Sequence, residues 1–138
     1  MEFSNDKDFK YVLQDASHLY LGARMSFQEM LDWEDVPFKM KSIIHKYFVE
    51  EGNDEAGFAL ALSNLEHKSF TYQVCKQLRL KVKAGTYHSK VNRKGEESKK
   101  YISKVYSLDD YLALIQENQE VVTEEISVSK LALLAFSV

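Results

Sequence analysis

The chain has 138 residues and a mass of 16.0 kDa, and 45% of its residues are hydrophobic, 12% aromatic and 28% charged. This balance is typical of a globular protein and argues against intrinsic disorder and against a coiled coil, and the length predicts one domain over residues 1–138. Five Gly and one Pro disfavour Gly-rich phosphate loops, propellers and turn-dense sandwiches, and a net charge of −3 argues against a dedicated DNA-binding domain that is basic throughout.

The first part of the chain is predicted to be helical. Between residues 8 and 21 the apolar side chains recur at spacings of three and four, which is typical of one face of an amphipathic helix, and Gly22 is expected to end it. A short second helix is expected after Ser26. Ser26 and Glu29 have the spacing of a capping box, in which each side chain satisfies the free backbone amide of the other residue.

The clearest helical pattern runs from residue 37 to residue 50. Pro37 suits the first turn of a helix, where no amide donor is needed, and the apolar side chains that follow fall on one stripe. That stripe consists of Met40, Ile43, Ile44, Tyr47 and Phe48. Gly52 lies where a left-handed terminating residue is expected, and Asp54 can cap a further helix that runs to about Glu66.

Residues 69–83 satisfy two periodicities, because their apolar residues alternate as in a strand and also recur as in a helix. A strand of this length would be unusually long, so we expect a helix over residues 69–77 and then a strand over residues 78–83. Leu80 and Val82 are expected to point inward in either case.

The next segment predicts a β-hairpin. Strands over residues 86–91 and 99–106 flank Asn92–Gly95, a turn-like stretch with Asn at its start and Gly at its end. Because this region carries many Lys and Arg residues, residues 78–106 are predicted to form a basic hairpin with a mobile tip.

The last part of the chain predicts one helix and one strand region. Ser107, with Asp110 three residues later, has the pattern of a helix start, and this helix is expected to reach about Asn118. Beyond Val121 the residues are rich in strand formers, and from Leu131 to Val138 they are nearly all apolar. This pattern is typical of a strand that is covered on both faces.

Taken together, the pattern predicts an α+β domain. Helices over about residues 8–77 come first, and a small, mainly antiparallel sheet over about residues 78–138 follows, with one intervening helix.

Charge is distributed unevenly along the chain. Residues 1–67 hold 6 Lys or Arg against 13 Asp or Glu, and residues 105–138 hold 1 against 6, so both ends are acidic. Residues 68–104 hold 11 Lys or Arg against 2 Glu. A local field of this sign can attract polyanions, or it can pair with the acidic helices of the protein itself.

A search for catalytic and metal-binding patterns finds no motif. The histidines form no HxH or HExxH pair, and His67, Cys75 and His88 would meet at a metal only by an accident of folding. Asp15 and His18 are one helical turn apart, a spacing that suits a general base, but no nucleophile elbow accompanies them. There is neither a P-loop nor a dinucleotide fingerprint, so no cofactor and no metal are predicted, and an enzyme would need residues that only the fold brings together.

The basic hairpin is the feature with functional promise. Lys and Arg residues alternate in it with tyrosines, and a basic two-stranded ribbon can follow phosphates while tyrosine rings stack on bases. The first hypothesis is a non-enzymatic binding module that contacts a polyanion, in particular nucleic acid, or an acidic protein surface. The candidate binding residues are Lys81, Lys83, Tyr87, Lys90, Arg93, Lys94, Lys99, Lys100, Tyr101 and Lys104.

Other interpretations stay open. Exposed lysines protect sheet edges against aggregation and a hairpin tip is normally charged, so the basic segment can also be a solvated or self-paired surface. A different class is an assembly protein that forms a homo-oligomer through the apolar stripe of residues 37–50 or through the C-terminal strand.

The expected compartment is the cytoplasm. Cys75 has no second cysteine as a disulfide partner, the chain starts with acidic and polar residues, and its longest apolar run is Leu131–Phe136. No membrane partner is therefore expected. Low Pro and Gly with abundant Lys, Glu and Tyr is compatible with a bacterial source.

Overall fold

The computed structural model describes residues 6–52, 54–118 and 120–137, and these confirm the α+β class. Five antiparallel strands form one sheet in the order β1-β2-β5-β3-β4. The strands are β1 (Val12–Gln14), β2 (His18–Gly22), β3 (Lys81–Val91), β4 (Glu97–Ser107) and β5 (Val121–Ser129). The helical elements are η1 (Asp6–Phe9), α1 (Phe27–Asp32), α2 (Phe38–Ile44), the π-helical turn η2 (His45–Val49), α3 (Phe58–Ser63), α4 (Phe70–Gln77), α5 (Leu108–Glu117) and α6 (Lys130–Ala135).

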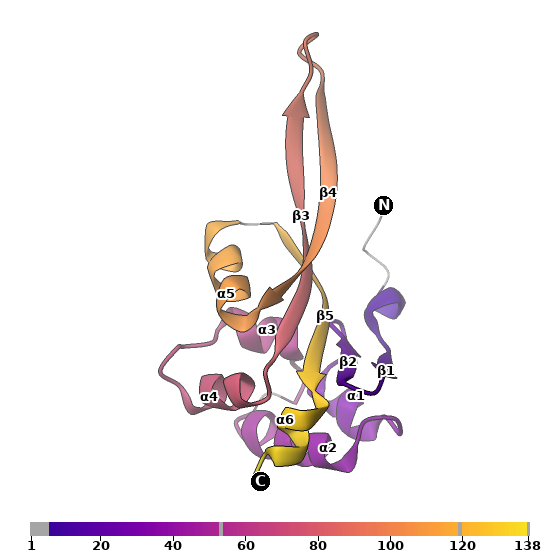
Figure 1. The fold of residues 1–138 in the computed structure, drawn as a ribbon, viewed down its shortest axis with the longest axis vertical. Coiled ribbons are helices and arrows are strands. Elements are labelled where there is room, and N and C mark those ends of the chain that lie inside the picture. Colours follow the sequence, from indigo (N-terminus) through magenta and orange to yellow (C-terminus); the bar gives the residue numbers. More distant parts are fainter. Residues whose placement is uncertain (1–5, 53, 119, 138) are drawn as a thin grey trace.

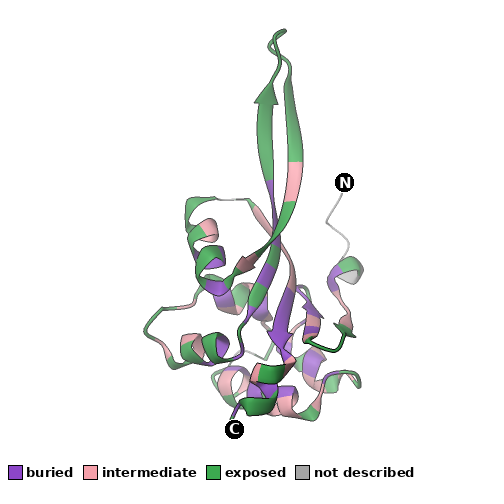
Figure 2. Cartoon of the chain, in the orientation of Figure 1, coloured by how far each residue is buried: buried purple, intermediate pink, exposed green. Residues whose placement is uncertain are grey.

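The helices surround one end of the sheet, and β3 and β4 run on together beyond the other strands (Figure 1). The buried residues lie in the helical end, whereas the outer half of the β3–β4 ribbon is exposed (Figure 2). Within the described segments, no helix is both long enough and apolar enough to cross a lipid bilayer.

The helix predicted over residues 8–21 is wrong, because this segment forms β1, a turn and β2. In the turn, Asp15 Oδ1 accepts the backbone amides of Ser17 and His18, both at 2.8 Å, a local bond that competes with helix formation. Leu19 and Leu21 then alternate into the core, and β2 pairs with β5. Tertiary pairing therefore selected the strand from a pattern that also fitted a helix.

The capping box at Ser26 is confirmed. Ser26 Oγ accepts the amide of Glu29 at 3.0 Å, and Glu29 Oε1 accepts the amide of Ser26 at 3.1 Å. The helix predicted from Asp54 is shorter than expected and begins after Gly57, because residues 54–56 form hydrogen bonds with the start of α1 instead. The carbonyls of Asp54 and Ala56 accept the amides of Gln28 and Phe27, which holds this non-helical segment against the start of α1.

The apolar stripe of the predicted helix over residues 37–50 is confirmed as core. Helix α2 continues into the π-helical turn η2, and Met40, Ile43, Ile44 and Phe48 are fully buried. Phe48 packs against Phe27 and Phe58, with ring centroids 4.6 and 5.2 Å away. These four side chains of the stripe therefore pack in the core of the protein. Gly52 has the left-handed conformation expected of it, with φ of 86°.

Helix α4 follows the prediction, but the separate strands expected over residues 78–83 and 86–91 form one continuous strand, β3, and β4 begins at Glu97 rather than at residue 99. The helix ends at Gln77 as expected, and the strand starts at Lys81 rather than Leu78, because Leu78 caps the helix. Leu80 and Val82 are buried, as predicted. Helix α5 follows the hairpin and starts at the predicted cap, where Ser107 Oγ accepts the amide of Asp110.

The strand predicted over the C-terminal apolar run is wrong from residue 130 onward, where α6 forms. β5 ends at Ser129 because its pairing ends there: Ser129 faces His18, the first residue of β2. Ser129 Oγ then accepts the amide of Ala132 and starts the helix. Leu133 and Phe136 reach the core.

Candidate functional site

The basic hairpin is anchored at one end and free at the other. β5 pairs with β3 only from Lys81 to Thr86, and β4 forms the edge of the sheet. The strands pair with each other as far as Val91 and Glu97. Residues 87–101 therefore form a two-stranded ribbon with both edges unpaired in the described structure, which we call the arm. Every residue of the arm except Tyr101 is exposed (Figure 2).

The tip of the arm is a tight turn built around Asn92. The Asn92 side chain accepts the amides of Lys94 and Glu96, both at 2.9 Å, and its carbonyl accepts the amide of Gly95 at 3.1 Å. Gly95 has a φ of 78°, a left-handed conformation that suits glycine. The predicted turn at Asn92–Gly95 is thus present, and it directs Arg93 and Lys94 outward at the end of the ribbon.

The base of the arm is fixed by a tyrosine laid across a glycine. The Tyr101 ring occupies the space that a Cβ on Gly85 would need, and its hydroxyl donates to Glu124 at 2.8 Å. Ser103 Oγ donates to the same carboxylate oxygen at 2.6 Å. Glu124 lies at a β-bulge in β5, where the register with β3 shifts. Burial, and then the hydrogen bond to Glu124, raise the pKa of Tyr101 above its usual range.

The two arm tyrosines therefore differ in what they offer a ligand. Tyr101 is held within the fold, and its ring centroid lies 5.0 Å from that of Tyr87. Tyr87 is 38% exposed and is the ring that remains available for stacking.

The arm carries its cations on both faces. Opposed residues share a face of the ribbon and successive residues alternate, so Lys90 and Lys100 lie on one face and Lys99 on the other. Nearer the body, Lys104 shares the first face, whereas Lys81 and Lys83 share the second. In the described part of the chain, no ion pair involves any of these lysines, Arg93 or Lys94.

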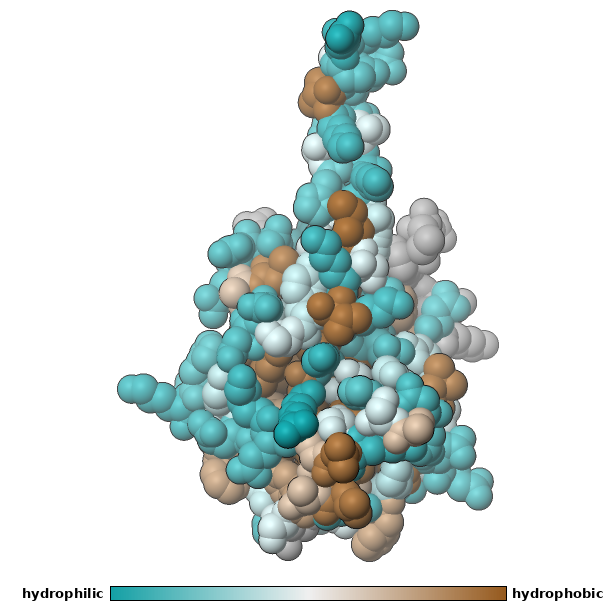
Figure 3. Space-filling model, viewed as in Figure 1, coloured by the Kyte–Doolittle hydropathy of each residue, from teal (hydrophilic) through white to brown (hydrophobic). Residues whose placement is uncertain are grey.

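The acidic residues of the arm are partly engaged with neighbours. Ser89 Oγ donates to Glu97 at 3.0 Å, and the Asn92 side-chain amide donates to Glu96 at 3.4 Å. Five cations against two carboxylates leave the arm with a net positive charge. Its surface is predominantly hydrophilic (Figure 3).

The basic segment does pair with an acidic residue of the protein, but through Lys76, which lies outside the arm. Lys76 of α4 donates to Asp109 of α5 at 2.9 Å, and the hydroxyl of Tyr72 donates to the same carboxylate at 2.5 Å. The Tyr72 and Lys76 bonds hold the pKa of Asp109 below its usual range. This contact ties α4 to α5 and leaves the arm cations unused.

The residues that the sequence offered for catalysis are not assembled into a site. Asp15 binds backbone amides and the Tyr20 hydroxyl, while His18 Nδ1 contacts Ser17 Oγ at 2.7 Å. Cys75 is fully buried, and burial raises the pKa of its thiol to about 12, which disfavours the reactive thiolate. Over the described residues, no three His, Cys, Asp or Glu side chains form a group able to hold a metal ion.

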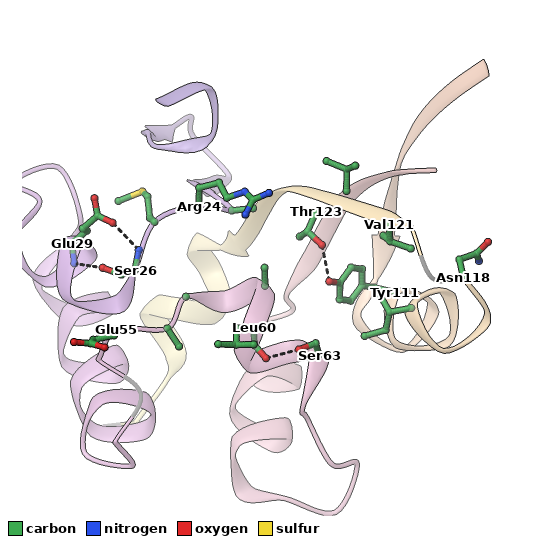
Figure 4. Close-up of a pocket in the computed structure, with 17 residues that line it drawn as sticks. Arg24, Ser26, Glu29, Glu55, Leu60, Ser63, Tyr111, Asn118, Val121 and Thr123 are labelled. Atoms are coloured by element: carbon green, nitrogen blue, oxygen red, sulfur yellow. Dashed lines mark hydrogen bonds between the residues drawn. The ribbon is translucent and has the colours of Figure 1, made fainter. Parts of the chain in front are cut away.

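A groove of about 810 Å³ lies between α3, α5 and the loop before α1 (Figure 4). Its polar groups are largely engaged with one another: the Ser26–Glu29 capping box forms one wall, and Tyr111 is hydrogen-bonded to Thr123 at 2.7 Å on the other. The lining includes two carboxylates but no histidine. The groove therefore does not bring together a histidine–carboxylate pair.

No protein-family model matches the sequence, and no curated protein matches it significantly.

Proposed function

We propose that this protein is a non-enzymatic binding module that grips nucleic acid with the arm. The observation that carries the proposal is a ribbon whose cations have no partners within the described structure and which extends beyond the sheet. Lys90, Arg93, Lys94, Lys99 and Lys100 are the contacts to phosphate, and Tyr87 is the stacking side chain.

The shape of the arm supports a groove as its target. Paired strands lie about 4.8 Å apart, and the major groove of B-DNA, about 12 Å wide, admits a two-stranded ribbon. A groove has phosphates along both walls, so an inserted ribbon benefits from cations on both faces. A flat acidic surface would contact only one face at a time.

Edge protection explains part of the pattern but not the extension. Lysines on β4 would keep the edge of a sheet from pairing with another chain. Protecting the sheet edge does not require β3 and β4 to extend past Thr86, where the pairing of β3 with β5 ends. The ribbon continues for five more residues of β3, with no packing against the body, and a free two-stranded ribbon is only marginally stable.

The test is fluorescence anisotropy with labelled single- and double-stranded oligonucleotides at 50 and 200 mM salt. We expect micromolar binding at the lower salt. If three to five phosphates are contacted, the affinity should fall by roughly 40- to 500-fold across this range, because counterion release scales with the number of contacts. Absence of binding at 50 mM salt would overturn the proposal and direct the search to acidic protein partners.

Charge-matched variants separate the arm from general electrostatics. The triple variant Lys90→Gln, Lys99→Gln, Lys100→Gln should lose at least tenfold in affinity, and adding Arg93→Gln and Lys94→Gln should abolish binding. The control removes three cations from the body, Lys41→Gln, Lys46→Gln and Lys68→Gln, and should change affinity less than about threefold. Equal losses in both triple variants would show that the arm is not the site.

A further inference from the structure

A second charged hollow lies at the opposite end of β3 from the tip of the arm. It has a volume of about 560 Å³ and is formed where the β1–β2 turn, the start of β3 and the start of α6 meet. We call it the root pocket. Its basic lining residues are His18, Arg79, Lys81 and Lys130, and its apolar wall is formed by Leu131 and Leu134.

Backbone bonds hold the three segments of the root pocket together. The amide of Lys130 donates to the carbonyl of Ser17 at 2.9 Å, and the amide of Ser129 donates to the carbonyl of Leu78 at 3.2 Å. The cationic side chains of the pocket are therefore brought together by the fold, although Lys130 is distant in sequence from the other two.

The root pocket is positive and has no counter-charge in its lining. Arg79, Lys81 and Lys130 contribute cations, His18 adds an imidazole, and no carboxylate lines the pocket. Over residues 6–52, 54–118 and 120–137, none of these four side chains forms an ion pair. Asp15, in the β1–β2 turn beside the pocket, is the neighbouring acid, but its carboxylate accepts the amides of Ser17 and His18 and the Tyr20 hydroxyl and forms no ion pair with these cations in the described structure. The three cations therefore repel one another, and a bound anion would relieve that repulsion.

Arg79 occupies a backbone conformation in which glycine is the usual residue. Its φ of 53° lies in the left-handed region, and it is the only non-glycine residue with a positive φ in the described part of the chain. The amides of Arg79 and Leu80 donate to the carbonyls of Lys76 and Cys75, which is the hydrogen-bond pattern of a Schellman helix end. No described contact uses the Arg79 guanidinium, so the fold does not explain why an arginine stands there.

One wall of the root pocket is apolar. Leu131 and Leu134 are one turn apart on α6, and they are 74% and 75% exposed. Figure 3 shows apolar surface over α6, bordered by hydrophilic surface, at the end of the molecule away from the arm. A purely ionic ligand such as a nucleic-acid backbone would leave this wall unused.

We propose that the root pocket binds a small amphiphilic anion, namely a phosphate or carboxylate group attached to an aliphatic chain. Arg79, Lys81 and Lys130 hold the anionic group, and Leu131 and Leu134 cover the chain. Ser17 Oγ lies at the same opening, but it donates its proton to Asp15 Oδ1 at 3.1 Å, so the three cations alone hold the anionic group. This site is separate from the arm and does not depend on the proposed binding of nucleic acid.

The test is isothermal titration calorimetry of the full chain with four soluble probes below their micelle-forming concentrations. Octyl phosphate and octanoate combine charge with a chain, inorganic phosphate has charge alone, and octyl glucoside has a chain alone. We expect at least one of the two charged amphiphiles to bind tenfold or more tightly than either single-feature probe. Which of the two binds better distinguishes a phosphate ligand from a carboxylate ligand.

The decisive variant is Arg79→Gly, because glycine fits the left-handed backbone better than arginine. We expect this variant to lose at least tenfold in affinity for the preferred amphiphile while its Tm stays the same or rises. Leu131→Ser with Leu134→Ser should weaken the amphiphile but not inorganic phosphate. The arm variant Lys90→Gln, Lys99→Gln, Lys100→Gln serves as the control and should bind as the wild type does.

Three results would overturn the root pocket as a site. The first is equal affinity for inorganic phosphate and both amphiphiles, and the second is an unchanged affinity in Arg79→Gly. The third is binding to vesicles that contain anionic lipid without binding to either soluble amphiphile, which would indicate a membrane surface as the target instead.

Discussion

At the scale of single residues, Gly85 controls how the arm joins the body. The absence of a side chain at this position lets the Tyr101 ring lie flat on the strand and reach Glu124. Glu124 is available there because the bulge in β5 sets it apart from the regular pairing. A glycine, a tyrosine and a bulged glutamate therefore act together at the point where the ribbon leaves the sheet.

Substituting Gly85→Ala should displace the Tyr101 ring, break its hydrogen bond to Glu124 and destabilise the protein by about 1–3 kcal/mol. In a Tyr101→Ala background the added methyl group has room, and the same substitution should cost less than about 1 kcal/mol or stabilise the strand slightly. Urea unfolding of the four proteins measures both values. Equal costs in the two backgrounds would contradict the contact between Gly85 and Tyr101.

At the scale of elements, the arm and the body have separate sources of stability. In the body, β2, β5 and the first half of β3 are paired on both sides, as β5 is by β2 and β3, and bury their inner faces in the core. Beyond its base, where Tyr101 bonds to Glu124 and His88 contacts Thr86, the strands of the arm pair only with one another. The arm is therefore an appendage of the fold, and its length can be changed without changing the core.

Replacing residues 89–99 with Asn-Gly should shorten the arm and leave the body folded. The amide of Asn92 donates to the carbonyl of Glu96, which makes these two residues a hydrogen-bonded pair of the ladder. Every second pair of an antiparallel ladder is of this kind, so His88 and Lys100 are also a hydrogen-bonded pair. A two-residue turn can join such a pair. We expect the free energy of unfolding to change by less than about 1 kcal/mol, because no core contact is lost. Binding of oligonucleotides should disappear in the same protein. A loss of several kcal/mol would show that the arm supports the fold.

At the scale of the whole molecule, the basic segment of the sequence divides into separate places. Part of it forms the arm, part of it enters the root pocket, and Lys76 pairs with Asp109 between two helices. The acidic residues lie mostly in the N-terminal and C-terminal segments that build the body. An approaching polyanion is therefore attracted to the arm and repelled by much of the body, which orients it before contact.

The same division predicts a steep gradient in hydrogen exchange. Amides of β5 are paired on both sides, whereas those of the arm have partners only within the ribbon. We expect the arm amides of the free protein to exchange at least about a thousandfold faster than those of β5, as measured by mass spectrometry. Similar protection in both regions would mean that the arm packs against a surface in solution, such as the acidic body of a second copy.

Several features were predictable from the sequence because neighbouring residues determine them. The capping box of Ser26, the cap at Ser107, the left-handed Gly52 and the turn at Asn92–Gly95 each depend on side chains within a few residues of the backbone groups that they satisfy. The periodicity of residues 37–50 likewise indicated the buried face of a helix. The candidate hairpin followed from the same local rules, applied to two strands joined by a short turn.

The remaining features were decided by distant partners. Residues 8–21 carry a pattern that fits a helix and a strand, and pairing with β5, more than a hundred residues away, selected the strand. The apolar C-terminal run became a helix because the pairing of β5 with β3 ends at Ser127 and its pairing with β2 ends at Ser129. Three further features depend on the path of β5 and on where its pairing with β3 ends. These are the unpaired edges of the arm, the position of Tyr101 on Gly85, and the convergence of Arg79, Lys81 and Lys130. Local chemistry thus determined the caps, the turns, most helices and the charge of this protein. Tertiary pairing decided the two terminal segments and which charges project or converge, because those features depend on contacts that no local pattern encodes.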